Sequence, residues 1–298
     1  MGSLASTVLP AAGGPARAVR IDRVRWPVGL CFESHGVQVA VRCNHPALSE
    51  RLLRLLPPGA RPAAGTSLDA LFSLWVPVGG RPRPARVYAG SQRLACTRDL
   101  PQALAVLESE LRHAVATRAR GRTFVHAGVV GWRGRAILLP GRSRSGKTTL
   151  VAELVRAGAE YLSDEFAVLD GSGRVHPFAK RLSFRGEGGC DRHAWQAAVE
   201  EIGGRAAQGP LPVGLVAVTE YEPGAAWSPA PLTPGQGVLE LLAHTVPARL
   251  RPGASLEALG HTVVGATLLK GPRGEAGEAA RRLLEHDWRG GGQKERTA

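Results

Sequence analysis

Residues 138–150 read LLPGRSRSGKTTL, and this stretch decides the fold of the 298-residue chain. Residues 141–148 follow the pattern G-x-x-x-x-G-K-T. The apolar run AILLP at 136–140 predicts a buried strand before the pattern, and KTTLVAELVRAG at 147–158 predicts a helix after it. A glycine-framed loop between a strand and a helix is the setting in which this pattern binds phosphate. The sequence therefore predicts an α/β protein with a nucleotide-binding loop.

The chemistry of such a loop accounts for the residue types in it. Glycines let backbone N–H groups turn inward around phosphate oxygens, and the N-terminus of the next helix adds partial positive charge. Lys147 can reach the outer phosphates, and the Thr148 hydroxyl can bind Mg²⁺. Arg144 stands where many such loops have a second small residue, which predicts a slightly altered cradle. The predicted nucleotide-binding residues are Gly141, Arg142, Ser143, Arg144, Ser145, Gly146, Lys147, Thr148 and Thr149.

Two adjacent carboxylates, Asp164 and Glu165, follow the next predicted strand in YLSDEFAVLD at 161–170. Ligands of open α/β sheets bind at the carboxyl ends of strands, so we expect both acids beside the γ-phosphate. One carboxylate can orient and deprotonate an acceptor hydroxyl while the other helps to hold Mg²⁺. His126, in FVHAGVV at 124–130, lies on the strand that enters the site. A pair of His126 with a carboxylate would orient that carboxylate and tune its pKa.

Together these segments resemble the catalytic core of HPr kinase/phosphorylase and related serine kinases. The resemblance covers about residues 121–290 and is densest from 126 to 170. It implies a P-loop kinase core of the phosphoenolpyruvate-carboxykinase-like type, with ATP and Mg²⁺ as cofactors. It also implies transfer of the γ-phosphate to a serine hydroxyl of a protein or peptide acceptor. By the same resemblance His126 pairs with Asp164 as the catalytic acid/base, Glu165 is the second acid and holds Mg²⁺ with Thr148, and homo-oligomers are frequent.

One part of the family pattern differs in this chain. HPr kinase proper has a later Arg-Gly-Leu-Gly-type signature, whereas residues 180–189 here read KRLSFRGEGG. HPr itself is therefore not the expected acceptor, and the sequence leaves the acceptor open. We expect Lys180, Arg181 and Arg185 to form a basic lip beside the site, where developing phosphate charge or an acidic acceptor needs cations.

The chain divides into two expected domains with tails. Residues 17–120 are expected to form a small N-terminal α+β domain, residues 121–290 the catalytic domain, and residues 1–16 and 291–298 disordered tails. Within the first, GVQVAVR, LFSLWVPV and ARVYAG predict strands, and HPALSERLLRLLPPG predicts a short helix. A longer helix is predicted at 99–121 as the bridge between the domains. The second domain has further strands at TFVHAGVVGW and LPVGLVAVTEY, and helices at TPGQGVLELLAHTV, SLEALGHTVV and GEAGEAARRLLEH.

Composition restricts the class of partner. The formal net charge is +13, but only four of the 38 Lys and Arg residues are Lys, which is typical of a GC-rich coding sequence with scattered surface arginines. No arginine run is interleaved with aromatics, so no nucleic-acid partner is expected. No apolar run approaches the roughly 20 residues of a membrane span, so we expect no membrane partner and a cytoplasmic protein. The four cysteines lack C-x-x-C spacing, which argues against a zinc or redox site.

Three other functions share part of this pattern. An ABC-type ATPase shares the GRSRSGKTTL loop, but it needs a Gln loop and an LSGGQ signature before its acidic pair, and this chain has neither. A nucleotide-dependent binding module would keep Lys147 and tolerate loss of Asp164. A kinase for a small metabolite stays open, because loops whose shape the sequence does not give would build its acceptor pocket.

Overall fold

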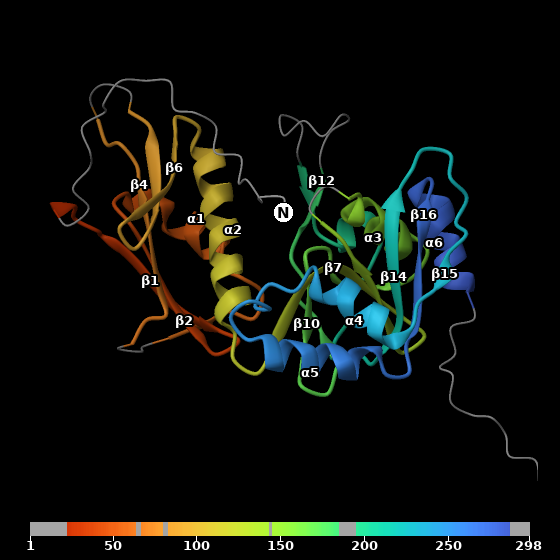
Figure 1. The fold of residues 1–298 in the computed structure, drawn as a ribbon. Helices are drawn as coiled ribbons and strands as arrows, with labels where there is room; N and C mark the ends of the chain where they lie inside the picture. The colour runs from red at the N-terminus through yellow and green to blue at the C-terminus, as the bar shows by residue number, and fades with distance from the viewer. Residues whose placement is uncertain (1–22, 64–66, 80–82, 143–144, 185–194, 287–298) are drawn as a thin grey trace, which may run out of the picture.

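The computed structural model describes residues 23–63, 67–79, 83–142, 145–184 and 195–286. The described chain is a mixed α/β structure with a six-stranded sheet, a larger sheet of eight strands and a two-stranded pair. The six-stranded sheet and the eight-stranded sheet lie side by side, with the long helix α2 (Leu100–Arg118) between them (Figure 1).

The N-terminal sheet has the strand order β3-β1-β2-β4-β5-β6. Its strands are β1 (Val28–Ser34), β2 (Val37–Cys43), β3 (Arg61–Pro62), β4 (Ala70–Trp75), β5 (Ala85–Ala89) and β6 (Gln92–Thr97). The strands expected from GVQVAVR, LFSLWVPV and ARVYAG correspond to β2, β4 and β5. Strands β1, β3 and β6 were not predicted from the sequence. The helix expected at 45–59 is shorter, with a 3₁₀ turn (Pro46–Leu48) followed by α1 (Ser49–Leu53).

Helix α2 closes the core of the N-terminal sheet. Its apolar stripe of Leu104, Leu107, Leu111 and Val115 is buried in one cluster with residues of that sheet, as the helical spacing predicts. The same cluster contains Phe124, Phe166 and Phe178, which belong to the C-terminal part of the chain. The cores of the two sheets are therefore continuous at this point.

The C-terminal sheet has the order β11-β10-β7-β8-β14-β16-β15, and β9 also pairs with β7. Its strands are β7 (Thr123–Trp132), β8 (Arg135–Pro140), β9 (Glu160–Ser163), β10 (Phe166–Leu169), β11 (Val175–His176), β14 (Val213–Tyr221), β15 (Ala230–Pro231) and β16 (Thr267–Arg273). The separate pair is β12 (Leu182–Phe184) with β13 (Trp195–Ala197), and a 3₁₀ turn (Glu200–Ile202) follows it. Strands β12, β13, β15 and β16 were not predicted from the sequence.

Helices cover both faces of the C-terminal sheet. On one face α3 (Lys147–Arg156) and α6 (Ala276–Glu285) pack with Ile137 and Leu139 of β8. On the other face α4 (Pro234–Leu242) and α5 (Pro252–Val263) belong to the cluster that contains Leu138. Neighbouring residues of a strand point to opposite faces, so a strand buried on both sides is apolar throughout. That is the reason AILLP could be read as a buried strand.

The strands of this sheet place the loop and the two acids at the same edge of the sheet. Strands β8, β14 and β16 are parallel, and β7 is antiparallel to both β8 and β9. Strand β7 lies between the loop strand β8 and β9, the strand that precedes Asp164. Asp164 and Glu165 fill the break between β9 and β10, which pair with different parts of β7. Across β7 from this break, Ala127 pairs with Pro140, where the loop begins.

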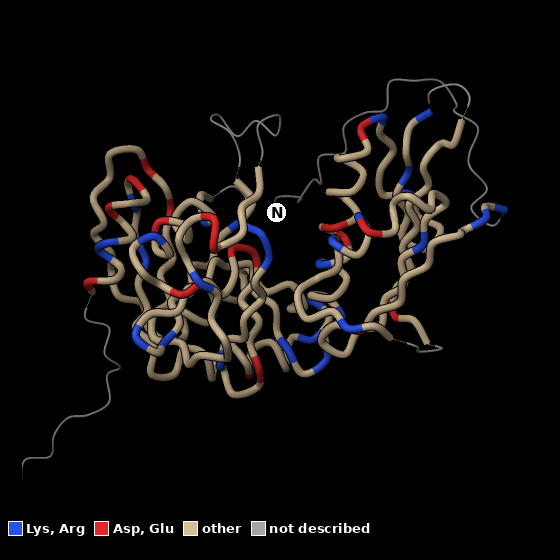
Figure 2. Tube along the Cα trace, turned by 180° about the vertical axis from the view of Figure 1, so that it is seen from behind, with Lys and Arg blue, Asp and Glu red and all other residues tan. Residues whose placement is uncertain are grey.

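Two further features concern the expected partners. Within the described residues, no helix combines the length and the apolar character needed to cross a membrane. Lys and Arg residues are spread over both halves of the trace and alternate with Asp and Glu (Figure 2).

Candidate functional site

The glycine-framed loop lies where the sequence predicts it. Strand β8 ends at Pro140 and helix α3 begins at Lys147. The backbone N–H of Gly141 donates to the carbonyl of His126 on β7 at 3.2 Å, which fixes the start of the loop to the sheet. Two predicted phosphate-binding residues, Ser143 and Arg144, lie outside the described residues.

Two glycines of the loop lie close to neighbouring side chains, and one of them has a left-handed backbone. Gly146 has a φ of 77°, in the left-handed region that favours glycine. A Cβ at Gly146 would also lie 2.6 Å from Nη2 of Arg273, and a Cβ at Gly141 would lie 2.8 Å from Oγ of Ser145. Both distances are closer than van der Waals contact allows, so a larger residue at either position would displace the neighbouring side chain, and at residue 146 it would also strain the backbone.

Lys147 turns its ammonium group back into the loop. Its Nζ donates to the carbonyl oxygens of Gly141 at 2.9 Å and Arg142 at 2.5 Å, and lies 3.5 Å from Oγ of Ser145. Burial lowers the pKa of Lys147 to about 8, against the opposing effect of Asp164 and Glu165. The ammonium is thus held by neutral oxygens at the position where a phosphate would supply negative charge.

Thr149, which was also predicted to bind nucleotide, is exposed in the first turn of α3.

Asp164 is the centre of the side-chain network. Its Oδ2 accepts a hydrogen bond from the Thr148 hydroxyl at 2.9 Å, and its Oδ1 accepts one from the Tyr161 hydroxyl at 2.9 Å. The Asp164 side chain is only 2% exposed. Burial raises the pKa of Tyr161 well above its usual value, so the phenol stays a donor to this carboxylate. The sequence analysis missed Tyr161, which lies in the predicted strand and gave no signal of its own.

Lys180 and Arg181 of the predicted basic lip have different partners in the structure. Lys180 forms an ion pair with Asp164 at 3.0 Å and lies 3.9 Å from Glu165. Arg181 instead contacts the exposed Glu201 at 3.0 Å. Arg185 lies outside the described residues. Lys180 is therefore the member of the predicted group that the structure brings to the acids, and Arg181 is not.

Glu165 faces a different partner from Asp164. Its carboxylate forms an ion pair with Arg112 of α2 at 2.8 Å, and Arg112 also pairs with Glu108 at 2.6 Å. The contact lacks the alignment of a hydrogen bond, since Oε2 of Glu165 and Nε of Arg112 have no hydrogen-bond partner within the described chain. Burial raises the pKa of Glu165 despite the opposing effects of Arg112 and Lys180. Glu165 and Thr148 were predicted to hold Mg²⁺ together, whereas the carboxylate that contacts the Thr148 hydroxyl in the described structure is that of Asp164.

His126 also differs from its expected arrangement. No hydrogen bond joins His126 to Asp164, although both are described; its ring packs against Phe166 with the centroids 4.7 Å apart. The two residues are cross-strand partners on β7 and β10. Burial lowers the pKa of His126 to about 4, with further lowering by Lys147, His113 and His244. The His126 ring is therefore neutral at neutral pH, and Lys147 is the largest electrostatic influence on it.

An arginine that the sequence analysis missed contacts the loop from β16. Arg273 is 2% exposed. Its Nη2 donates to the carbonyl oxygens of Ser145 at 3.3 Å and Gly146 at 3.2 Å. Its signal in the sequence is weak, because TLLKGPR contains Gly and Pro and lacks the pattern of a typical strand.

The side chains present suit one hard cation that is shared with a ligand. Among the described residues, no group of three or more His, Cys, Asp or Glu side chains is arranged to hold a metal ion alone. The hydroxyl of Thr148 and the carboxylate of Asp164 are adjacent oxygen donors. Mg²⁺ is commonly bound by one or two protein oxygens, with phosphate and water supplying the rest. The donor set therefore fits Mg²⁺ that arrives with a nucleotide.

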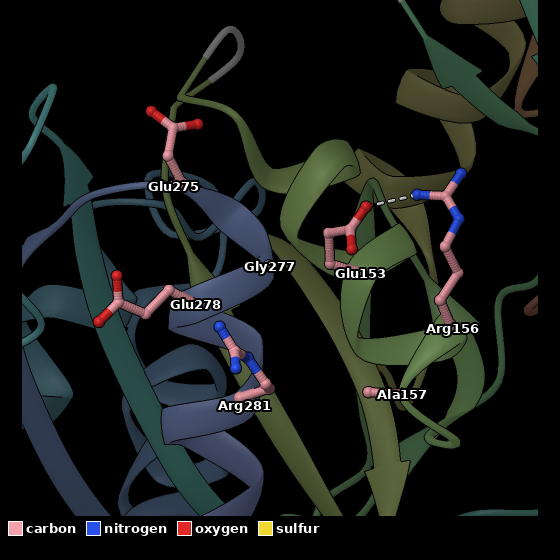
Figure 3. Close-up of a pocket in the computed structure, with 7 residues that line it drawn as sticks. All are labelled: Glu153, Arg156, Ala157, Glu275, Gly277, Glu278 and Arg281. Carbon is pink, nitrogen blue, oxygen red and sulfur yellow. Dashed lines mark hydrogen bonds and ion pairs between the residues drawn. The ribbon is translucent and has the colours of Figure 1, made fainter.

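A surface groove of about 480 Å³ lies between α3 and α6 (Figure 3). It is lined by Glu153, Arg156 and Ala157 on one side and by Glu275, Gly277, Glu278 and Arg281 on the other. Most of its walls are charged, and Glu153 and Arg156 pair with each other at 2.5 Å. The groove does not include the glycine-framed loop or the acids, so it is distinct from the site described above.

Comparisons with known proteins do not identify a family for this chain. No protein-family model matches the sequence, and the search of curated proteins gives no significant match.

Proposed function

We propose that this protein is an ATP-dependent kinase that transfers the γ-phosphate to a serine hydroxyl of a protein or peptide. The observation that carries the proposal is the contact between the phosphate loop and the acid pair. Thr148, the last residue of the loop pattern, is hydrogen-bonded to Asp164 at 2.9 Å. A threonine hydroxyl at the end of the loop pattern beside an aspartate at a strand end is the arrangement that serves Mg·ATP in P-loop enzymes.

The proposal includes the finer fold expected from the resemblance, a P-loop core of the phosphoenolpyruvate-carboxykinase-like type. It is supported by a loop that follows β8 and by an acid pair that follows β9. It is also supported by the order of these elements along the chain. The N-terminal sheet with α2 is proposed as an accessory part, which contacts the site through Arg112 and Glu165.

In the proposed reaction the loop binds the nucleotide phosphates. The backbone N–H groups at the start of α3 face the phosphate oxygens, and the helix N-terminus contributes partial positive charge. The Lys147 ammonium exchanges the carbonyls of Gly141 and Arg142 for a phosphate oxygen. This exchange favours the charged form of Lys147, because an anion replaces neutral acceptors.

Asp164 is proposed to orient the acceptor hydroxyl and to receive its proton. In the described structure Lys180 and Tyr161 contact Oδ1 of Asp164, while Thr148 contacts Oδ2. An arriving phosphate gives the Lys180 ammonium a second anionic partner, which leaves Oδ1 open to a hydroxyl donor. Thr148 and Asp164 would hold Mg²⁺ together with the nucleotide. The ion would stabilise the negative charge on the phosphoryl group that is transferred. Tyr161 keeps the carboxylate in position throughout.

The alternatives differ in what they do with bound ATP. A binding module would hold Mg·ATP without transferring phosphate, and a small-metabolite kinase would phosphorylate a compound instead of a protein. The buried network around Asp164 favours transfer, because a module has no need of a carboxylate with three polar side-chain partners. The choice between a protein and a small acceptor rests on the resemblance alone.

The test combines nucleotide binding with transfer. The full-length protein is incubated with Mg²⁺ and γ-labelled ATP together with proteins encoded by neighbouring genes, and labelled acceptors are identified. Label on a serine, lost when that serine is changed to alanine, is the expected result. Calorimetry with Mg·ATP on the same preparation separates the alternatives. Tight binding without label on any protein would favour the module or the metabolite kinase, and absence of binding would overturn the proposal.

A further inference from the structure

The side chain of Arg273 is buried directly behind the glycine-framed loop. It lies at the end of β16, and its guanidinium group reaches Ser145 and Gly146, residues more than 120 positions earlier in the chain. Burial is the main cause that lowers the pKa of Arg273, which nevertheless stays charged near neutral pH. A buried cation is costly unless it is well paired, so its place beside two backbone carbonyls needs a reason.

The hydrogen bonds of Arg273 fix two peptide planes of the loop. The described chain has no cis peptide bonds. In a trans peptide the C=O and the following N–H point in opposite directions. When Arg273 holds the carbonyls of Ser145 and Gly146 on its side, the N–H groups of Gly146 and Lys147 point to the other side. These N–H groups are among those that cradle phosphate in a loop of this pattern.

The loop and Arg273 fit each other closely. A Cβ on residue 146 would lie 2.6 Å from Nη2 of Arg273, so a larger residue there would displace the guanidinium from its present position. The Gly146 carbonyl also accepts the hydrogen bond of Leu150 N–H at 3.1 Å, the first bond inside α3. Arg273 therefore acts on the peptide that joins the loop to the helix.

Neighbouring side chains keep Arg273 in this position. Tyr221 lies over the guanidinium, 5.4 Å from ring centroid to Cζ, and its hydroxyl donates to Glu275 at 2.9 Å. The Nη1 atom donates to the carbonyl of Gly274 at 3.1 Å. The Nε atom is buried without a hydrogen-bond partner within the described chain. The guanidinium is thus held from its far side, and its Nη2 is aimed at the loop.

We propose that Arg273 is a positioning residue that sets the phosphate loop in its binding conformation before the nucleotide arrives. This inference rests on the proposed function, since it assumes that the loop binds nucleotide phosphates. It adds a residue from the last strand of the sheet to a site otherwise built from residues 126–180. Arg273 acts through the backbone carbonyls and not by touching the phosphates.

The experiment compares Arg273→Gln, Arg273→Lys and the unchanged protein by calorimetry with MgADP and with adenosine. Arg282→Gln serves as the control, because Arg282 is an exposed arginine of the same C-terminal segment, 4.0 Å from Glu278. We expect Arg273→Gln to weaken MgADP binding about tenfold or more, since charge-assisted hydrogen bonds are lost. Any residual adenosine affinity should stay the same. Arg273→Lys should recover little, because an ammonium cannot reproduce the planar fork that spans two carbonyls.

Each outcome decides the inference. Parental MgADP affinity in folded Arg273→Gln would overturn it, and so would full recovery by Arg273→Lys, which would show that charge alone is needed. Equal losses for MgADP and adenosine would indicate general damage and also overturn it. If the unchanged protein binds no nucleotide, the proposed function itself fails. Should Arg273→Gln not fold, Tyr221→Leu at a half-exposed position tests the same support, with an expected loss of a few-fold for MgADP alone.

Discussion

Thr148 and Asp164 are joined by a hydrogen bond of 2.9 Å across 16 positions of sequence. The first belongs to the N-terminal turn of α3 and the second to the break between β9 and β10. The break lies across β7 from the start of the loop, so the geometry of one long strand brings the two residues together. The predictions below concern what each group around this contact contributes.

Lys147→Ala is expected to abolish Mg·ATP binding in calorimetry. The Lys147 ammonium points back into the loop, where it bonds to the carbonyls of Gly141 and Arg142. Lys270→Ala is the matched control, because Lys270 is half exposed and pairs with Glu240 at 2.5 Å, away from the loop. Unchanged affinity in a folded Lys147→Ala protein would contradict nucleotide binding by this loop.

Asp164→Asn is expected to lower the transfer rate by about 10²–10⁴ while Mg·ATP affinity stays largely intact. The amide keeps the shape of the carboxylate but cannot receive the acceptor proton. A higher Mg²⁺ concentration should be needed for the remaining activity, because Asp164 is the carboxylate beside Thr148. Single-turnover transfer at several Mg²⁺ concentrations measures both effects.

Glu165→Gln provides the comparison for Asp164→Asn. Glu165 is paired with Arg112 and not with Thr148, so its loss should lower the rate less than tenfold. If Asp164→Asn transferred phosphate at the parental rate while Glu165→Gln did not, the roles would be reversed and Glu165 would be the base.

Lys180→Met is expected to lower the free energy of unfolding by about 3 kcal/mol. Removing one partner of a buried ion pair typically has an effect of this size. The side chains of Lys180 and Asp164 are only 12% and 2% exposed, so the aspartate would be left without its cation in a buried site. Arg181→Met is the control. It breaks an ion pair with Glu201 in which both side chains are about half exposed, and such pairs contribute about 0–1 kcal/mol. Urea unfolding at pH 7.5 measures both, and equal losses would contradict a special role for Lys180.

The parts of the site that are local in sequence could be predicted, and those that depend on distant packing could not. The loop and α3 have a motif, a strand pattern and a helix pattern within a short stretch, and their bounds were predicted within two residues. Arg273 depends on contacts with Ser145 and Gly146 from 128 and 127 positions away. No local pattern carries that information, and the strand that presents Arg273 was itself missed.

Sequence patterns also failed to distinguish the roles of adjacent residues. Lys180 and Arg181 are equivalent as cations in sequence, but only Lys180 is directed to Asp164. The acid pair shows it as well, because Asp164 and Glu165 take different partners. Which of two neighbours faces a site depends on where a strand ends and on its register, and sequence patterns give these least reliably. The predicted pairing of His126 with Asp164 depends on register in the same way, and in the described structure His126 lies opposite Phe166 across the sheet.

His126 and His35 are expected to make the protein less stable as the pH falls from 6.5 to 4. Burial lowers the pKa of each from 6.5 to about 4. Between these values the unfolded chain binds more protons than the folded chain, so acid favours unfolding. For each histidine the loss between pH 7.5 and pH 5 amounts to about 2 kcal/mol. Urea unfolding at the two pH values measures it.

His126→Leu should reduce the difference in unfolding free energy between pH 7.5 and pH 5, and His35→Leu together with it should reduce the difference further. His286→Leu is the control, because His286 is exposed at the end of α6 and should leave the difference unchanged. Asp170 does not interfere in this range. Although burial raises its pKa, hydrogen bonds from Ser172 and His176 lower the pKa of Asp170 to about 2, so the stability it contributes is lost only in stronger acid. An undiminished difference in the double variant would show that other groups cause the acid sensitivity.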